Sequence, residues 1–231
     1  FGITSLAPID YLYLFNDEAR ELEPDLVLTC VFVGNDIGLV RSGSPIRPAN
    51  WLTFALAKRL FRMGVESHRR SGTPDVKRTV GYVMSPEQYL EHVVLDLPPL
   101  LSPPPPSIER RWVSTLEVLE RIGRMAGDGR FAVAVYPCEP QVEPALLARA
   151  CERGQVDLGS VDPTAPGRRI TEHFAVAGVP VCDLLPGFVA RRTEGRAYEE
   201  NETHWNERGN KIAAEVLANW LEPLVRARLV R

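Results

Sequence analysis

The chain has 231 residues, of which 45% are hydrophobic and 25% charged, and its formal net charge is −3. This balance is typical of one folded globular domain and excludes a disordered chain. Lysine and arginine are scattered along the sequence, which argues against a nucleic-acid-binding protein. No apolar run reaches the roughly 18 residues that a membrane-spanning helix needs.

The first third of the chain predicts a helix followed by a buried strand. Residues 8–22 place aromatic and aliphatic side chains at helical spacing, and Pro24 ends the pattern. Residues 26–33 form an apolar run rich in β-branched residues. Because this run is continuously apolar rather than alternating, it predicts a parallel strand covered on both faces. The strand ends in Gly-Asn-Asp, residues 34–36.

Residues 39–110 are the least regular part of the sequence. We predict that they form a variable, insertion-like region within a single domain that spans 1–231. The features predicted inside this region are a helix over 51–63, a loop over 71–77, a helix start at Ser85-Pro86 and an extended surface segment over 98–106.

The second half alternates amphipathic helices with short apolar strands. The predicted helices cover 108–125, 145–153, 168–177 and 210–224, and the predicted strands cover 131–136 and 179–182. This order indicates an α/β fold with a doubly wound parallel sheet. Ligands in such sheets bind beyond the carboxyl ends of the strands. Four positions in the loops after strands or late in the chain are expected near this edge: Asn35, Pro137-Cys138, Asp183 and His204.

The four cysteines show no C-x-x-C spacing, and three of them fall in or beside apolar runs. Buried free thiols are therefore expected rather than a disulfide framework or a metal site. The arginine-rich segments 191–196 and 226–231 are expected to be solvated surface. The sequence starts at Phe1 without a methionine, so it supports no conclusion about a compartment.

His204 is the strongest candidate for a catalytic residue. Glu202 lies two residues before it in the same predicted loop, and a carboxylate can orient an imidazole and stabilise its charged form. Asn201 is an alternative orienting residue, and Asn206 is the expected N-cap of the final helix. The competing interpretation is an ordinary surface or core histidine, since an acidic residue two positions before a histidine occurs by chance in many proteins.

Asn35 also has two interpretations. Gly-Asn-Asp is a common turn sequence, so Asn35 can simply belong to a turn. Alternatively, its side-chain amide can donate to an oxyanion, an interaction worth roughly 3 kcal/mol in a water-poor site. Asp36 is expected to anchor the loop rather than to take part in chemistry.

These motifs together resemble the SGNH/GDSL hydrolase superfamily. Residues 32–36, Phe-Val-Gly-Asn-Asp, are similar to its Gly-x-Asn-Asp block, and residues 202–209, Glu-Thr-His-Trp-Asn-Glu-Arg-Gly, are similar to its late acid–base block. Residues 1–8 look like the tail of the block that gives a backbone oxyanion donor, at Ser5. In three respects the chain differs from the family. The Gly-Asp-Ser block with the nucleophile is missing, Ser5 replaces glycine, and Glu202 replaces aspartate.

The resemblance implies a three-layer α/β/α sandwich of the flavodoxin-like SGNH type, without its first strand and nucleophile block. The strand at 26–33 would then have a bare edge, and the isolated chain is expected to be poorly soluble. Ser5 could be taken for the nucleophile, but no aspartate precedes it. We therefore assign it to the oxyanion hole through its N–H, together with Asn35.

The implied function is that of a serine esterase, with His204 as general base and then acid and Glu202 as its orienting residue. The substrate is expected to be a small-molecule or carbohydrate O-acyl ester, acetyl or another short chain, and no metal or organic cofactor is implied. Two alternatives remain open. They are a polysaccharide O-acetyltransferase and a catalytically inactive carbohydrate-binding or scaffold domain.

Overall fold

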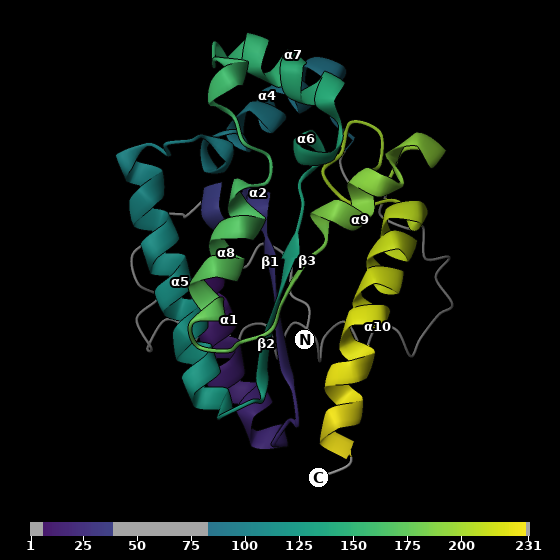
Figure 1. Cartoon of the computed structure of the whole chain (residues 1–231). Helices are drawn as coiled ribbons and strands as arrows, with labels where there is room; N and C mark the ends of the chain where they lie inside the picture. The colour runs from purple at the N-terminus through teal and green to yellow at the C-terminus, as the bar shows by residue number, and fades with distance from the viewer. Residues whose placement is uncertain (1–6, 39–82, 230–231) are drawn as a thin grey trace, which may run out of the picture. The chain divides into compact units, whose positions relative to one another are not determined.

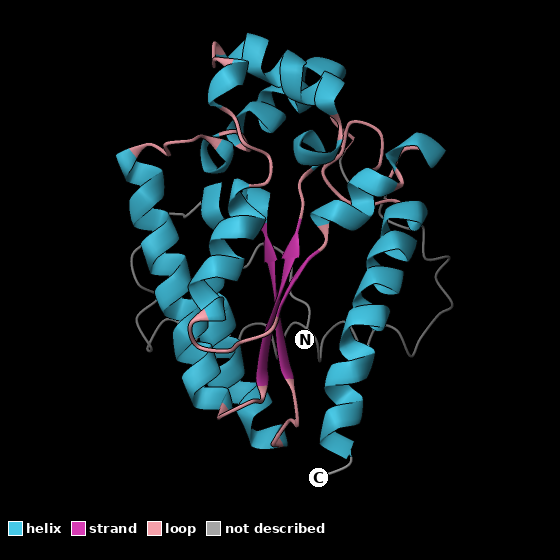
Figure 2. Cartoon of the chain, viewed as in Figure 1, coloured by secondary structure: helices cyan, strands magenta, loops and turns pink. Residues whose placement is uncertain are grey.

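A computed structural model of the chain describes residues 7–38 and 83–229, and in this part the fold is mixed α/β (Figures 1 and 2). Three parallel strands form one sheet in the order β1-β2-β3, with β1 at Val27–Phe32, β2 at Phe131–Tyr136 and β3 at Val181–Asp183. The predicted strands are confirmed, within two residues at their ends. The predicted helix over 51–63 and loop over 71–77 lie outside the described residues.

The central strand β2 sets the register of the sheet. Val27 pairs with Phe131 and Phe32 with Tyr136, while Val135 pairs with Asp183 on the other side of β2. All three strands therefore end at the same edge, as the sequence predicts. Within the described residues, β1 pairs with β2 alone, so its outer edge has no neighbouring strand there.

Helices α1, α5 and α8 cover one face of the sheet (Figure 1). Helix α1, Pro8–Leu14, continues through a π-turn at Phe15–Ala19 and a 3₁₀ turn at Arg20–Leu22, so the helical run predicted over 8–22 is confirmed. Helix α5 spans Pro106–Ala126, and α8 spans Ala165–Ala175. The buried residues of these helices pack against every second residue of the strands, and they include Leu12, Trp112, Leu119, Ile170, Val31, Val133 and Val135.

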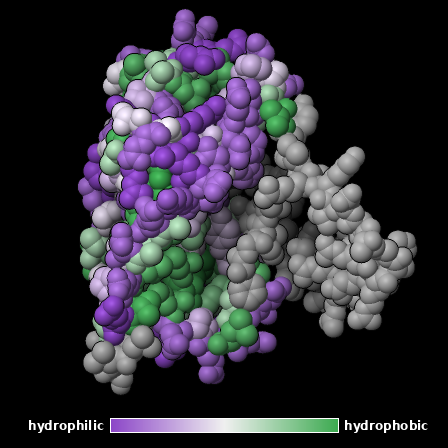
Figure 3. Space-filling model, turned by 90° about the vertical axis from the view of Figure 1, so that its right-hand side faces the viewer, coloured by the Kyte–Doolittle hydropathy of each residue, from purple (hydrophilic) through white to green (hydrophobic). Residues whose placement is uncertain are grey.

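Helices α9, Leu185–Ala190, and α10, Glu207–Leu229, lie on the other face (Figure 1). They form a second buried cluster with the alternate strand residues, among them Ala134 and Cys182. Since both faces of β2 are buried, the continuous apolar run in the sequence is explained. On the side that carries α10, a broad apolar area is visible (Figure 3), and Leu28, Cys30 and Leu217 are only partly buried on this face.

Short helices lie beyond the carboxyl ends of the strands. Helix α2, Val33–Gly38, follows β1 directly, and α6, Glu139–Val142, follows β2. Helix α4, Pro86–Leu95, packs against α7, Pro144–Gly154. Shorter 3₁₀ turns lie at Pro98–Leu100, Leu158–Ser160 and Arg192–Glu194. The predicted start of α4 is confirmed, because the Ser85 hydroxyl accepts a hydrogen bond from the Gln88 N–H at 3.2 Å.

The prediction of an extended surface segment over 98–106 is wrong for its first part. Pro98–Leu100 forms a 3₁₀ turn in which Pro99 and Leu100 are buried. Leu101 then forms an antiparallel bridge with Val161. The proline-rich composition suggested solvent exposure. The apolar Leu100 side chain is instead buried in the core, because removing apolar surface from water is favourable. The assignment of 1–231 to one domain and of 39–110 to an insertion-like region stays a prediction.

Within the described ranges, no helix combines the length and the apolar character needed to cross a membrane.

Candidate active site

The loop before α10 is a closed hairpin, which we call the late loop, residues 196–206. Tyr198 and Trp205 face each other in an antiparallel bridge. The Glu199 N–H donates to the His204 carbonyl at 3.0 Å, and the Asn206 N–H donates to the Ala197 carbonyl at 3.1 Å. These paired backbone groups fix the tip of the loop, which carries Glu202.

The structure brings Glu202 and His204 into contact. The Glu202 carboxylate hydrogen-bonds to Nδ1 of His204. The Glu202 side chain is 17% exposed and the His204 side chain 78% exposed, so the carboxylate is sheltered and the imidazole reaches into solvent. A carboxylate on Nδ1 fixes the ring orientation and leaves Nε2 available for proton transfer. Of the two orienting residues considered from the sequence, Glu202 is therefore the one that contacts the histidine.

Asn201 has a structural role at the tip of the late loop. Its φ of 53° lies in the left-handed region, where asparagine is tolerated better than most residues. Its carbonyl accepts a hydrogen bond from the Met84 N–H at 3.2 Å. This bond ties the residue just before Glu202 to the segment that leads into α4.

The end of the late loop shows why its motif contains asparagine and glycine. Asn206 Oδ1 accepts a hydrogen bond from the Gly209 N–H at 3.0 Å, so the predicted N-cap of α10 is confirmed. The Asn206 amide donates in turn to the carbonyls of Arg196 and Tyr198. A Cβ at position 209 would overlap the carbonyl oxygen of Ala197. The motif therefore holds the loop against the first turn of the helix.

Trp205 fixes the late loop to the sheet. Its ring packs on Tyr136, the last residue of β2, with centroids 4.8 Å apart, and on Phe188 of α9, with centroids 5.0 Å apart. Tyr136 pairs in register with Phe32, the last residue of β1. Helix α2, which contains Asn35, begins at the next residue, Val33. The late loop and the Gly-Asn-Asp segment therefore lie at the same edge of the sheet.

The Gly-Asn-Asp segment is helical rather than a turn. Residues 34–36 lie in the first turns of α2, so the turn interpretation of Asn35 is wrong. The backbone of Asn35 is described, whereas its side chain lies outside what the structure describes. Its role as an oxyanion donor stays a prediction. The same holds for Ser5, which lies outside the described residues.

Asp36 anchors this segment, as the sequence predicts. Its carboxylate accepts a hydrogen bond from the Phe32 N–H at 2.8 Å and from the Tyr11 hydroxyl at 3.0 Å to each oxygen. The side chain is buried, and burial raises its pKa to about 7. Asp36 thus links α1, the end of β1 and the start of α2.

A second buried carboxyl group, Asp96, was not singled out in the sequence. It is the C-cap residue of α4, and a Cβ added to Gly34 would lie 2.8 Å from its Oδ1. Burial raises the pKa of Asp96 to about 7. The sequence does contain a signal that could have identified Asp96, because it is a lone acidic residue inside the apolar run Val-Val-Leu-Asp-Leu at 93–97.

The sequence also did not reveal an ion pair next to the late loop that joins a buried carboxylate to an exposed arginine. Glu139 is only 4% exposed, and it accepts hydrogen bonds from Arg196 Nε at 2.9 Å and Arg196 Nη2 at 3.3 Å. The Tyr89 hydroxyl donates to the same carboxylate. The Arg196 side chain stays 40% exposed, as predicted for segment 191–196, while its guanidinium pairs with the buried carboxylate.

Cys138 and Asp183, which were also predicted near this edge of the sheet, form hydrogen bonds that stabilise the neighbouring backbone. Cys138 is buried, and its N–H donates to Gln141 Oε1 at 3.0 Å. Asp183 Oδ1 accepts a hydrogen bond from the Leu185 N–H at 3.0 Å, which supports the start of α9.

All four cysteines are free, and three of them are buried. In the described part of the chain, no three His, Cys, Asp or Glu side chains gather in a group able to hold a metal ion.

Comparisons of the chain with models of known protein families, with curated proteins and with solved structures give no match.

Proposed function

We propose that the protein is a serine-dependent ester hydrolase of the SGNH type, which acts through an acyl-enzyme on a short O-acyl ester. The observation that carries the proposal is the hydrogen bond between Glu202 and Nδ1 of His204 in a loop held at the carboxyl edge of the sheet. An imidazole oriented in this way can take the proton of an attacking hydroxyl and return it to the leaving alcohol.

In the proposed reaction, four residues of the chain assist a serine that lies outside residues 1–231. Nε2 of His204 accepts the proton of a serine hydroxyl while that oxygen attacks the ester carbonyl. The Glu202 carboxylate stabilises the imidazolium, and the Asn35 amide and the Ser5 N–H donate to the oxyanion. His204 then protonates the leaving alcohol. In the second half of the reaction, His204 activates the water that releases the acid.

The fold that belongs to this proposal is a three-layer α/β/α sandwich in which the serine strand lies beside β1. Two observations support it. Helices lie on both faces of the described sheet, and the outer edge of β1 has no strand among the described residues. A Gly-Asp-Ser sequence does not occur in residues 1–231, so the proposal requires the nucleophile from outside them, and its test uses the complete gene product.

The test compares two histidines that both contact a glutamate. In the complete gene product, His204→Ala should lower the turnover of p-nitrophenyl acetate by roughly 10³-fold or more, with little change in KM. The matched control is His173→Ala. His173 Nε2 lies 2.8 Å from Glu120 Oε1, on the side of the sheet that α5 and α8 cover. This control should keep full turnover.

Turnover that persists in His204→Ala contradicts the proposal. So does the absence of labelling by a serine-directed fluorophosphonate in an otherwise folded wild-type protein. In that case the inactive binding domain becomes the better interpretation. Transfer of acetyl to an added sugar in preference to water would instead favour the O-acetyltransferase.

A further inference from the structure

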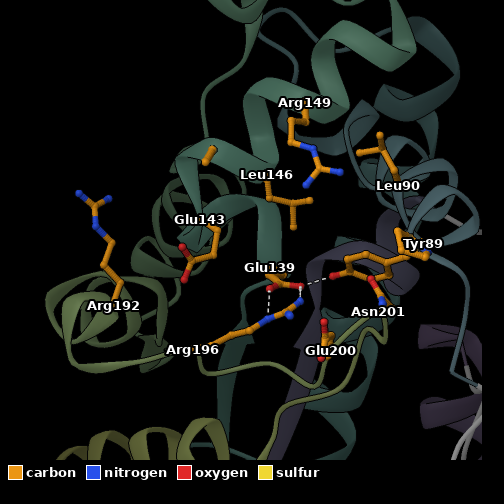
Figure 4. A pocket seen from close by; sticks show the side chains of 12 residues that line it. Tyr89, Leu90, Glu139, Glu143, Leu146, Arg149, Arg192, Arg196, Glu200 and Asn201 are labelled. Atoms are coloured by element: carbon orange, nitrogen blue, oxygen red, sulfur yellow. Dashed lines mark hydrogen bonds and ion pairs between the residues drawn. The ribbon is translucent and has the colours of Figure 1, made fainter.

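A cavity of about 540 Å³ opens next to the late loop (Figure 4). Its walls come from α4, from α6 and α7, and from the chain before and within the late loop. Glu200 and Asn201 line the cavity and directly precede Glu202. The volume lies within the usual range of small-molecule sites, of about 300–1,000 Å³. The cavity therefore adjoins the loop segment that carries the proposed catalytic pair, although neither Glu202 nor His204 lines it.

The floor of the cavity is a hydrogen-bonded cluster around the Glu139 carboxylate. Glu139 is held by the two guanidinium hydrogen bonds of Arg196 and by the Tyr89 hydroxyl (Figure 4). The Glu139 carboxylate is fully engaged, while Arg196 is 40% exposed and also interacts electrostatically with Glu200. A ligand would therefore meet a carboxylate that is already paired at the bottom of the cavity rather than a free negative charge.

The remaining charged groups have both signs. Among the described residues, no ion pair or side-chain hydrogen bond engages Arg149, Glu143 or Glu200. In Figure 4, Arg149 extends from α7 toward the floor, while Arg192 points away from it. One inward guanidinium thus faces two carboxylates. With two carboxylates against one inward guanidinium, a phosphate or carboxylate ligand would be repelled more strongly than Arg149 attracts it.

A neutral ligand with many hydroxyl groups fits this arrangement. Hydroxyls donate to carboxylates and accept from a guanidinium, so both signs of charge can be used at once. Leu90 and Leu146 are half-buried and offer apolar contact to the C–H faces of such a ligand. Saccharides combine these two properties.

We propose that this cavity is a binding subsite for a neutral saccharide, the alcohol half of the ester substrate. The assignment as the alcohol half rests on the proposed function, because it places the acyl group at Glu202 and His204. The binding of the saccharide depends only on the cavity.

The experiment measures binding by calorimetry to the complete gene product, with cellobiose, maltose, xylobiose and N,N′-diacetylchitobiose as neutral probes. Galacturonate disaccharide and inorganic phosphate serve as charged probes. At least one neutral disaccharide should bind more tightly than both charged probes. Arg149→Ala and Glu200→Gln should each weaken that binding by about tenfold or more, because each removes a hydrogen bond to a charged group.

A neighbouring arginine on the same helix provides the control. Arg153 is paired with Glu91 at 2.6 Å and does not line the cavity, so Arg153→Ala should bind the saccharide like the wild type. Melting curves confirm that each variant is folded. Failure of all four neutral probes to bind, tighter binding of a charged probe, or unchanged binding in both cavity variants overturns the proposal.

The same variants separate this proposal from the proposed function. His204→Ala should bind the saccharide normally and lose ester turnover. Saccharide binding without His204-dependent turnover would contradict the esterase and leave the subsite. Turnover of p-nitrophenyl acetate that depends on His204, without saccharide binding, would contradict the subsite and leave the esterase.

Discussion

Trp205 packs on Tyr136 with ring centroids 4.8 Å apart, and this contact joins the residue after His204 to the last residue of the central strand. Phe188 of α9 also packs on the Trp205 ring, with centroids 5.0 Å apart. The position of the histidine therefore depends on an aromatic cluster at the carboxyl edge of the sheet, and each contact that holds the late loop can be tested.

Trp205→Ala should release the late loop from the sheet. Loss of a half-buried indole with two aromatic neighbours is expected to lower the free energy of unfolding by about 2–3 kcal/mol. Hydrogen exchange should accelerate at the amides of Glu199 and Asn206, which close the hairpin. The control is Trp220→Ala, several turns along α10, which should lower stability without this local change in exchange. Unchanged exchange in Trp205→Ala would contradict the anchoring role.

Arg196→Ala should be more damaging than the removal of an arginine whose partner carboxylate is exposed, because the Glu139 side chain is only 4% exposed. It leaves the Glu139 carboxylate buried without its cation, at an expected cost of about 2–3 kcal/mol in urea unfolding. The double variant Glu139→Gln/Arg196→Met should recover part of this loss, because no buried charge remains. The control Arg226→Ala breaks the exposed pair with Glu222 and should cost less than about 0.5 kcal/mol. Equal effects of the two arginine variants would show that the buried Glu139 carboxylate does not depend on Arg196.

Asp96 should make the protein less stable as the pH rises. Its folded pKa of about 7 lies above the ordinary 3.8, so between these values the folded chain binds a proton that the unfolded chain releases. Its contribution to the free energy of unfolding is present below about pH 4 and is lost as the pH rises through about 7, by at most about 1.4 kcal/mol per pH unit.

Asp96→Asn removes this dependence, so the variant should gain stability relative to the wild type as the pH increases from 4 to 8. Denaturant unfolding at a series of pH values measures the difference. The exposed Asp128 supplies the control, and Asp128→Asn should follow the wild-type curve. A constant difference between Asp96→Asn and the wild type at all pH values would show that Asp96 does not titrate in this range.

Gly209→Ala should disrupt the late loop, although alanine is the better helix former by about 1 kcal/mol. The added methyl group would overlap the Ala197 carbonyl and approach the Trp205 side chain. We expect a net loss of about 2 kcal/mol or more in thermal unfolding, by analogy with other overpacked sites. The control is Lys211→Ala, two residues further along α10 at an exposed position, which should change stability by less than half as much. A stabilised Gly209→Ala would mean that the close approach is absent.

The sequence predicted the parallel strands, the helical run over 8–22, the start of α4 and the N-cap at Asn206. These features depend on local properties, namely apolar periodicity, capping side chains and proline at the first helical position. Local signals also led to the errors. The prolines at 98–106 suggested exposure, and Gly-Asn-Asp suggested a turn, but burial of Leu100 and the contacts of Asp36 decided otherwise.

Sequence alone also placed Glu202 and His204 in one loop, since only two positions separate them. Which side chain contacts the imidazole was decided by the hairpin that sets the tip of that loop. The pair of Glu139 with Arg196, the indole of Trp205 on Tyr136 and the cavity beside Asn201 join residues that are far apart in the sequence. Such contacts have no local signature, because they exist only after the strands, α7 and the late loop have packed together.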